Sequence, residues 1–235
     1  MRTRHRKRFL FGGFVLTAVL GGIVFLASAP REPTDNGKKL SAWLDELAAL
    51  DYSKRGDPHT QQAQAVRAIG TNALPWLLKD LRADGSRLHW RLNQILDRQS
   101  VINYRFPDIN RRLSRAAIGF QTLGEIAEPA ISELLSLVEV CPGYVPGALV
   151  GIGPPAMPAL QQCLTNTRSY PTSAGQIVPI PGNTIGAIHN AISAGRLSRS
   201  EVAVLVPAIR QLAQSTNRNP AQYDYATPFL RDFDQ

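Results

Sequence analysis

Three ten-residue stretches decide the fold, because they align without gaps: AIGTNALPWL (68–77), TLGEIAEPAI (122–131) and GIGPPAMPAL (151–160). Each has a leucine or isoleucine before a glycine, then an alanine, a proline and a second leucine or isoleucine at fixed offsets. Repetition of one pattern along a chain is typical of a protein built from several copies of one supersecondary unit.

The spacing of glycine and proline predicts that each stretch forms the corner between two antiparallel helices. The glycine ends the first helix, where the backbone needs a positive φ. The proline falls in the first turn of the second helix, where its missing N–H costs nothing. The small alanine between them lets the two helices approach. The predicted corner residues are Gly70, Pro75, Gly124, Pro129, Gly153 and Pro158.

The rest of the body also has the pattern of helices. Leucine and tryptophan side chains form one apolar stripe at helical spacing from Leu40 to Leu50, and no stretch alternates as a strand would. Asp57 and Pro58 are expected to open the next helix. The sequence therefore predicts an all-α protein.

The repeated motif resembles that of bacterial HEAT-like repeat proteins, including the group whose short repeats are similar to those of phycobilisome lyases. The resemblance covers roughly residues 57–215 and implies a right-handed α-solenoid of stacked helical pairs. The separation of 29 residues between Gly124 and Gly153 is similar to that of the short repeats. The Asp and Arg ladder of the family is approached only by Asp108 with Arg111, Arg112 and Arg115, so regular stacking elsewhere is in doubt.

The first 29 residues have the composition of a membrane anchor. Residues 1–8 hold five of the 26 basic residues, and residues 9–29 form an apolar segment long enough to cross a bilayer. Basic residues before such a segment stay in the cytoplasm. We therefore predict a cytoplasmic tail (1–8), a transmembrane signal anchor (9–29) in the inner membrane, a linker (30–38), the helical array (39–214) in the periplasm or outside the cell, and a C-terminal tail (215–235).

An alternative is a signal peptide that is cleaved near Ala29, which would release a secreted binding protein. The small residues Ala27 and Ala29 suit a signal peptidase, but Pro30 follows directly and the apolar segment is long for a signal peptide. Small residues repeat at every fourth position from Gly13 to Gly21, so a homodimer through the membrane helix is a minor expectation.

Local features of the body give further expectations. Ser198 and Glu201 form a capping box, and Pro207 should interrupt the helix that follows. Residues 165–182 lack helical periodicity and are expected to form a mobile loop, with partner binding as a minority hypothesis. Cys141 and Cys163 are expected to be buried free thiols, with a disulfide as the alternative.

No recognised catalytic motif occurs in the sequence, so we predict no catalytic residues and no enzyme. Residues 151–156 match the dinucleotide fingerprint G-x-G-x-x-A, but a helix precedes them and two prolines fill the turn, which is the wrong context. The four histidines have no partners at the spacing of metal ligands. We expect no cofactor-binding and no metal-binding residues.

Arginine and aromatic residues are interleaved between residues 82 and 115. This composition is typical of surfaces that bind anions or proteins, although solvated helix faces over packed aromatics are the simpler explanation. The candidate partner-binding patch comprises Arg87, Trp90, Arg91, Arg98, Tyr104, Arg105, Arg111, Arg112 and Arg115.

These features predict a non-enzymatic, membrane-anchored interaction or scaffold module whose protein partner is unidentified. An acidic partner is expected if the arginine patch is the binding surface. No nucleic acid is expected, because the body lies outside the cytoplasm. The alternative function is a lyase-like or chaperone-type enzyme subunit that handles a cofactor.

Overall fold

The computed structural model describes residues 31–50, 57–82, 109–171, 177–216 and 225–234. All described elements belong to one unit that begins at Pro33. Among these residues no helix is both long enough and apolar enough to cross a membrane. The predicted tail (1–8) and signal anchor (9–29) lie outside the described residues.

The described residues are mostly helical, which confirms the predicted all-α class. Two short antiparallel hairpins are the additions. The elements in chain order are β1 (Thr34–Asp35), β2 (Lys38–Lys39), α2 (Leu40–Ala49), α4 (Gln61–Ile69), η1 (Gly70–Ala73), α5 (Leu74–Leu81), α7 (Ile109–Leu123), η2 (Gly124–Ala130), α8 (Ile131–Leu137), α9 (Val145–Ile152), η3 (Pro154–Ala156), α10 (Met157–Thr165), β3 (Ser169–Pro171), β4 (Ile177–Pro179), α11 (Ile180–Ser193), α12 (Arg199–Val202), η4 (Ala203–Leu205), α13 (Val206–Thr216) and α14 (Ala226–Phe233).

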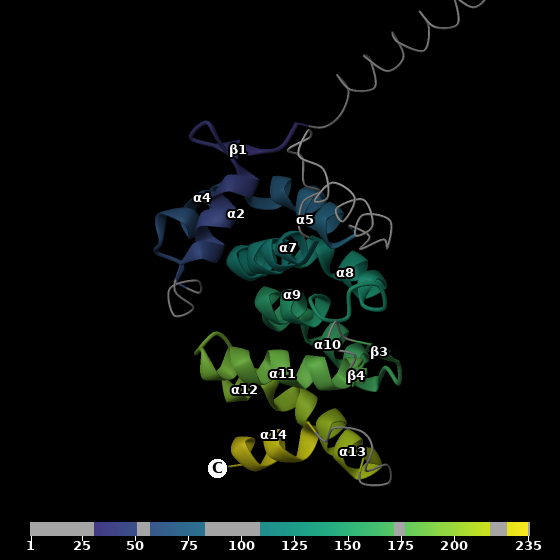
Figure 1. Ribbon diagram of the computed structural model, residues 1–235. Coiled ribbons are helices and arrows are strands. Elements are labelled where there is room, and N and C mark those ends of the chain that lie inside the picture. The colour runs from purple at the N-terminus through teal and green to yellow at the C-terminus, as the bar shows by residue number, and fades with distance from the viewer. Residues whose placement is uncertain (1–30, 51–56, 83–108, 172–176, 217–224, 235) are drawn as a thin grey trace, which may run out of the picture. The chain divides into compact units, whose positions relative to one another are not determined.

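The helices follow one another in two rows, as Figure 1 shows. In the first row α4 contacts α7, α7 contacts α9 and α9 contacts α11. In the second row α5 contacts α8, α8 contacts α10 and α10 contacts α13. The short 3₁₀ segments at the corners are also in series, because η1 contacts η2 and η2 contacts η3. Each helical pair is therefore stacked on the pair before it.

The three predicted corners have the same construction. Gly70, Gly124 and Gly153 have φ values of 60°, 60° and 91°, and a 3₁₀ segment starts at or directly after each of them. The alanine three residues later is completely buried in every corner: Ala73, Ala127 and Ala156 each have 0% exposure. This confirms that the glycines turn the chain and that the alanines allow the close approach.

The prolines differ slightly among the corners. Pro75 and Pro158 lie in the first turn of α5 and α10, as expected. Pro129 lies inside η2, which runs to Ala130 before α8 begins. In α8, which follows this longer 3₁₀ segment, Leu134 is fully buried and Leu135 is partly buried.

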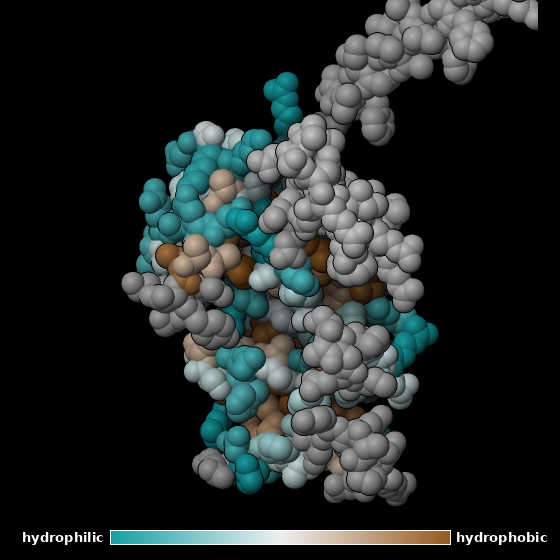
Figure 2. All heavy atoms as spheres, viewed as in Figure 1, coloured by the Kyte–Doolittle hydropathy of each residue, from teal (hydrophilic) through white to brown (hydrophobic). Residues whose placement is uncertain are grey.

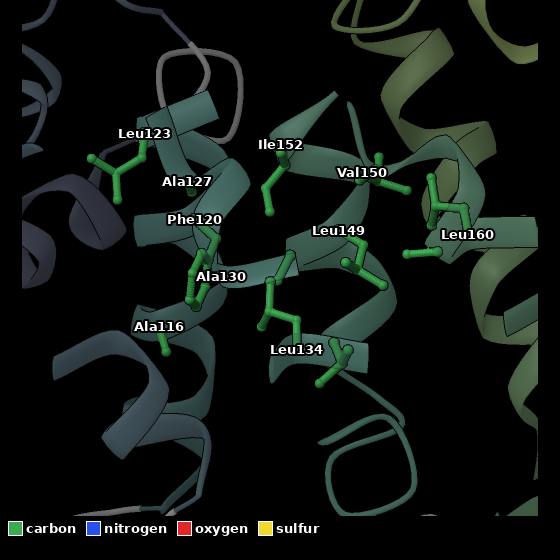
Figure 3. Close-up of a cluster of buried hydrophobic side chains, with 14 of the residues drawn as sticks. Ala116, Phe120, Leu123, Ala127, Ala130, Leu134, Leu149, Val150, Ile152 and Leu160 are labelled. Atoms are coloured by element: carbon green, nitrogen blue, oxygen red, sulfur yellow. The ribbon is translucent and has the colours of Figure 1, made fainter. Parts of the chain in front are cut away.

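Buried apolar side chains from neighbouring elements form one continuous core. Figure 3 shows the part between α7 and α10, where Phe120, Ala130, Leu134 and Leu149 gather between the helices. Phe120, Leu134 and Leu149 are fully buried. On the face drawn in Figure 2, hydrophobic residues form only small patches among hydrophilic ones.

The predicted start of the second helix was wrong. Asp57 and Pro58 form a turn in which the Asp57 carboxylate accepts a hydrogen bond from the His59 N–H (2.8 Å), and α4 starts only at Gln61, capped by Thr60. The predicted linker (30–38) includes most of the hairpin of β1 and β2. Its two-residue turn, Asn36–Gly37, has positive φ at both positions.

The C-terminal third also contains more structure than expected. Residues 165–182 include the paired strands β3 and β4 and the first residues of α11, and residues 172–176 of this predicted mobile loop lie outside the described residues. The helical array was predicted for 39–214, and its last helix, α13, ends at Thr216. The predicted tail (215–235) contains one more helix, α14, which packs on α11 and α13. The interruption near Pro207 is confirmed, since α12 ends at Val202 and α13 begins at Val206.

Candidate interaction surfaces

The predicted arginine patch is described only at one end. Arg87, Trp90, Arg91, Arg98, Tyr104 and Arg105 lie outside the described residues, as does Asp108 of the expected ladder. Arg111, Arg112 and Arg115 lie on the first two turns of α7.

These three arginines pair with acids on two other helices. Both Arg112 and Arg115 place an Nη2 atom 2.8 Å from a carboxylate oxygen of Asp80 on α5. Arg111 and Arg115 also approach Asp45 on α2, at 3.1 Å and 3.5 Å. The side chains of Asp80 and Arg115 are each only 17% exposed. The pairs therefore join α2, α5 and α7, which favours a structural role for these three arginines.

A groove lies along the first row of helices, between α7, α9 and α11. It consists of two adjoining hollows of about 320 Å³ and 600 Å³, which share Gln121, Val150 and Arg196. The smaller hollow follows α11 from Asn183 to Asn190. The larger hollow extends past the corners η2 and η3 to the end of α4. We call these two hollows together the α11 groove.

Arg196 is the half-buried cation of the α11 groove. Its Nη1 donates a hydrogen bond to Oε1 of Gln121 (2.9 Å), and the Gln121 Nε2 in turn donates to the Gly147 carbonyl (3.4 Å). Within the described residues Arg196 makes no ion pair. Its guanidinium is therefore held in place by a neutral amide, and no carboxylate of the described residues lies within ion-pair distance of it.

Two glutamates also border the larger hollow of the groove. Hydrogen bonds from the backbone and side chain of Ser198 lower the pKa of Glu201, which forms the predicted capping box at the start of α12. Glu125 is exposed at the corner η2. Arg67, at the far end of the larger hollow, donates through Nε to the Thr122 carbonyl at the end of α7 (2.8 Å).

A second cavity of about 330 Å³ lies between α10, α13 and the start of α11. Its lining is mainly apolar, with Leu164, Pro181 and Leu212 among the side chains. Tyr225 lines both this cavity and the α11 groove, and its ring lies against Gly182, where a Cβ atom would come within 2.5 Å of it.

Both cysteines are buried free thiols, as the first of the two alternatives expected. Burial raises the pKa of Cys163 to about 11 and also raises that of Cys141. The Cys141 Sγ donates to the carbonyl of Leu81 (2.7 Å). Because the thiolate is the reactive form, these environments oppose nucleophilic chemistry at neutral pH.

The structure places no metal-binding cluster of three or more His, Cys, Asp or Glu side chains within the part of the chain that it describes. The polar residues of the α11 groove were missed by the sequence analysis, because Gln121, Asn190 and Arg196 are far apart in the sequence. One signal in the sequence lies beside these polar residues: Gly147 and Gly186 are glycines inside helices. Analysis of the sequence pattern treats such glycines only as residues that destabilise a helix, so it does not point to a groove.

The fold and these surfaces define a class: a mostly helical protein of stacked helical pairs with a polar groove along one row of helices. Comparison with known protein families, curated proteins and solved structures found no match to this chain.

Proposed function

We propose that this chain is a non-enzymatic interaction or scaffold module, built as an α-solenoid of HEAT-like helical pairs and held at the membrane by residues 9–29. The observation that carries the proposal is the equivalence of the three corners, each with a positive-φ glycine and a fully buried alanine. Stacked units that contact only their neighbours leave long ridges and grooves exposed, and such surfaces commonly bind other proteins.

The successive contacts along the two rows of helices support the solenoid. Every described pair is joined to the next through both of its helices, from α4 and α5 to α11 and α13. Different elements cover the two ends of the array. At the N-terminal end the hairpin of β1 and β2 packs on α2, and the Trp43 indole N–H of α2 donates to the Asp35 carbonyl of β1 (3.3 Å). At the other end α14 packs on the last pair. Terminal caps of this kind are a general requirement of stacked arrays.

The chemistry of the described side chains favours binding over catalysis. The charged groups of α7 are paired with acids of the same chain, and burial raises the pKa of both thiols. Neither arrangement activates a nucleophile or a general base. The partner in this proposal is a protein met outside the cytoplasm.

Photo-crosslinking of the full chain in its native membranes, followed by identification of the attached proteins, tests the proposal. A crosslinker should be placed at Glu125 beside the groove, with a matched crosslinker at the exposed residue Gln161 of α10 as control. One protein attached specifically at Glu125 is the expected result. Absence of any specific protein adduct at exposed positions along both rows of helices would contradict the interaction module, and a chromophore or metal that copurifies would favour the cofactor-handling alternative.

The membrane tether is tested separately by fractionation. The full chain should remain with the membranes after alkaline carbonate washing and should keep residues 1–29. Mature protein that begins near residue 30 and is found in the soluble extracytoplasmic fraction would replace the anchor by the cleaved, secreted form.

A further inference from the structure

We propose that the α11 groove binds an extended polypeptide segment that carries an acidic side chain, with Arg196 as the residue that pairs with that side chain. This inference rests on the proposed interaction function and names the site and the chemistry of the partner. Three observations carry it: the unbalanced charge of Arg196, two glycines that the chain's own packing does not require, and the polar lining.

The first observation is electrostatic. Arg196 is half-buried, lines both hollows and has no ion-pair partner among the described residues. By contrast, Arg112 and Arg115, the two half-buried arginines of α7, are both paired with Asp80. A partly desolvated guanidinium gains most from a carboxylate that enters its site, because water screens the pair less there than at an open surface.

The second observation concerns Gly186 and Gly147, which line the groove from α11 and α9. A glycine inside a helix costs about 1 kcal/mol relative to alanine. A Cβ atom on Gly186 would meet no atom within 4 Å, and one on Gly147 would meet only the Gln121 amide at 3.7 Å. Internal packing therefore leaves both glycines unexplained, whereas close approach by another backbone explains them.

Two other glycines beside the groove show the contrast. A Cβ atom on Gly151 would lie 2.5 Å from the Cα of Gln121, so the contact between α7 and α9 requires that glycine. A Cβ atom on Gly182 would lie 2.5 Å from the ring of Tyr225, so the present position of that ring depends on the glycine. Among the described helices, the glycines that packing leaves unexplained thus both line the groove.

The third observation is the match of the lining to a peptide. The Asn190 side-chain amide carries both a donor and an acceptor and makes no hydrogen bond within the described part of the chain, so it suits a peptide bond. Asn183 lies seven residues before Asn190 on the same helix, roughly 10 Å away, and its Nδ2 already donates to the Pro142 carbonyl (3.1 Å), so it marks the end of the groove. An extended segment of about three residues covers that distance.

The two glutamates of the larger hollow decide against a phosphate group as the ligand. A phosphate dianion bound at Arg196 would share the groove with Glu125 and Glu201. A peptide with a single carboxylate avoids most of that repulsion, and its basic or polar side chains can face Glu125. The lining therefore favours a polypeptide of mixed charge over a phosphorylated ligand or a lipid headgroup.

Selection from a displayed library of random 12-residue peptides tests the inference, with the full chain in detergent micelles as target. Enriched peptides should share an Asp or Glu. Binding of a fluorescent copy of the best peptide should weaken at least about tenfold in Arg196→Gln and in Gly186→Leu. Gln161→Leu, which adds a leucine to an exposed site on α10, should bind as the wild type does, and circular dichroism melting checks that every variant is folded.

Several outcomes would overturn the inference. The first is enrichment of peptides that share no acidic residue, and the second is unchanged peptide binding in either groove variant. The third is saturable binding of inorganic phosphate that Arg196→Gln abolishes, because that result would assign a small-anion site instead. The crosslinking experiment separates this inference from the broader proposal. A protein partner that still attaches to the Gly186→Leu chain would reject the groove while leaving the interaction module intact, whereas no partner at all would remove both.

Discussion

At the scale of single residues, the corner glycines determine how the chain turns. Gly70 and Gly153 combine positive φ values of 60° and 91° with ψ values of −139° and −148°. Residues with a Cβ atom rarely adopt this backbone conformation. Space is not the constraint, because a Cβ atom on either residue would meet nothing within 4 Å. The requirement is therefore one of backbone conformation alone.

Gly153→Ala should lower the free energy of unfolding by about 1 to 3 kcal/mol, because alanine is strained at this φ. Gly186→Ala is the matched control, since Gly186 lies within α11 and has open space around it. That variant should be more stable than the wild type by up to about 1 kcal/mol. Urea unfolding followed by circular dichroism measures both. Equal effects of the two substitutions would show that the corner conformation carries no special strain.

The residue scale is also where sequence analysis performed best. Gly70, Gly124 and Gly153 were identified from one repeated pattern, since backbone conformation and local chain direction depend on neighbouring residues. The partners of Arg112 and Arg115 were not, because Asp80 lies more than thirty positions away and nothing in the local pattern singles it out. The α11 groove was missed for the same reason.

At the scale of elements, α7 organises the N-terminal half of the described chain. It contacts α2, α4, α5 and α9. Its basic first turns meet the acids of α2 and α5, while Ala116 and Phe120 on its other face are completely buried. The helix is thus fixed both by ion pairs and by the core.

Asp80→Asn should destabilise the protein by about 1 to 3 kcal/mol, because two partly buried arginines lose their charged hydrogen-bond acceptor. Asp232→Asn serves as the control. Its carboxylate is 49% exposed and lies 3.7 Å from Arg231, so its loss should cost less than about 1 kcal/mol. Urea unfolding in the same buffer compares the two variants. Similar values for both would mean that the Asp80 pairs add nothing beyond an ordinary surface ion pair.

Elements at the ends of the stack were the hardest to predict. The turn of the first hairpin, Asn36–Gly37, is a recognisable signal for paired strands, but its strands are only two residues long and give no alternation. Helix α14 is held by Arg199, which donates to the carbonyls of Asp232 and Phe233, and by the ion pair of Arg210 with Asp234. Such contacts arise only after the chain has folded back.

At the scale of the whole described unit, each helical pair touches mainly its neighbours. The stability of the proposed solenoid is a sum of local terms, so a destabilising substitution at one end should affect only the neighbouring helices. The proposed solenoid therefore predicts unfolding in parts, in contrast to a globular domain with one central core.

Phe229→Ala tests this expectation. Phe229 is 4% exposed and stacks on Phe233 with ring centres 5.6 Å apart. Truncation of this well-packed side chain should lower the free energy of unfolding by about 3 to 5 kcal/mol. Amide hydrogen exchange should accelerate in α13 and α14 while α4 and α5 keep the wild-type rates.

Val204→Ala, which truncates a side chain that is 58% exposed, should leave every helix unchanged and serves as the control. If Phe229→Ala accelerates exchange equally in all helices, the unit unfolds as one body, and the additive view of the stack is wrong.

The mirror-image backbone at the three corners has a consequence for how the gene can change. Every single-base mutation of a glycine codon that alters the amino acid adds a side-chain carbon, so no gradual route leads away from glycine at positions 70, 124 and 153. Surface positions between the corners carry no such restriction. Descent with modification should therefore keep glycine at these three positions while the stretches between them diverge, lengthen or acquire new binding preferences.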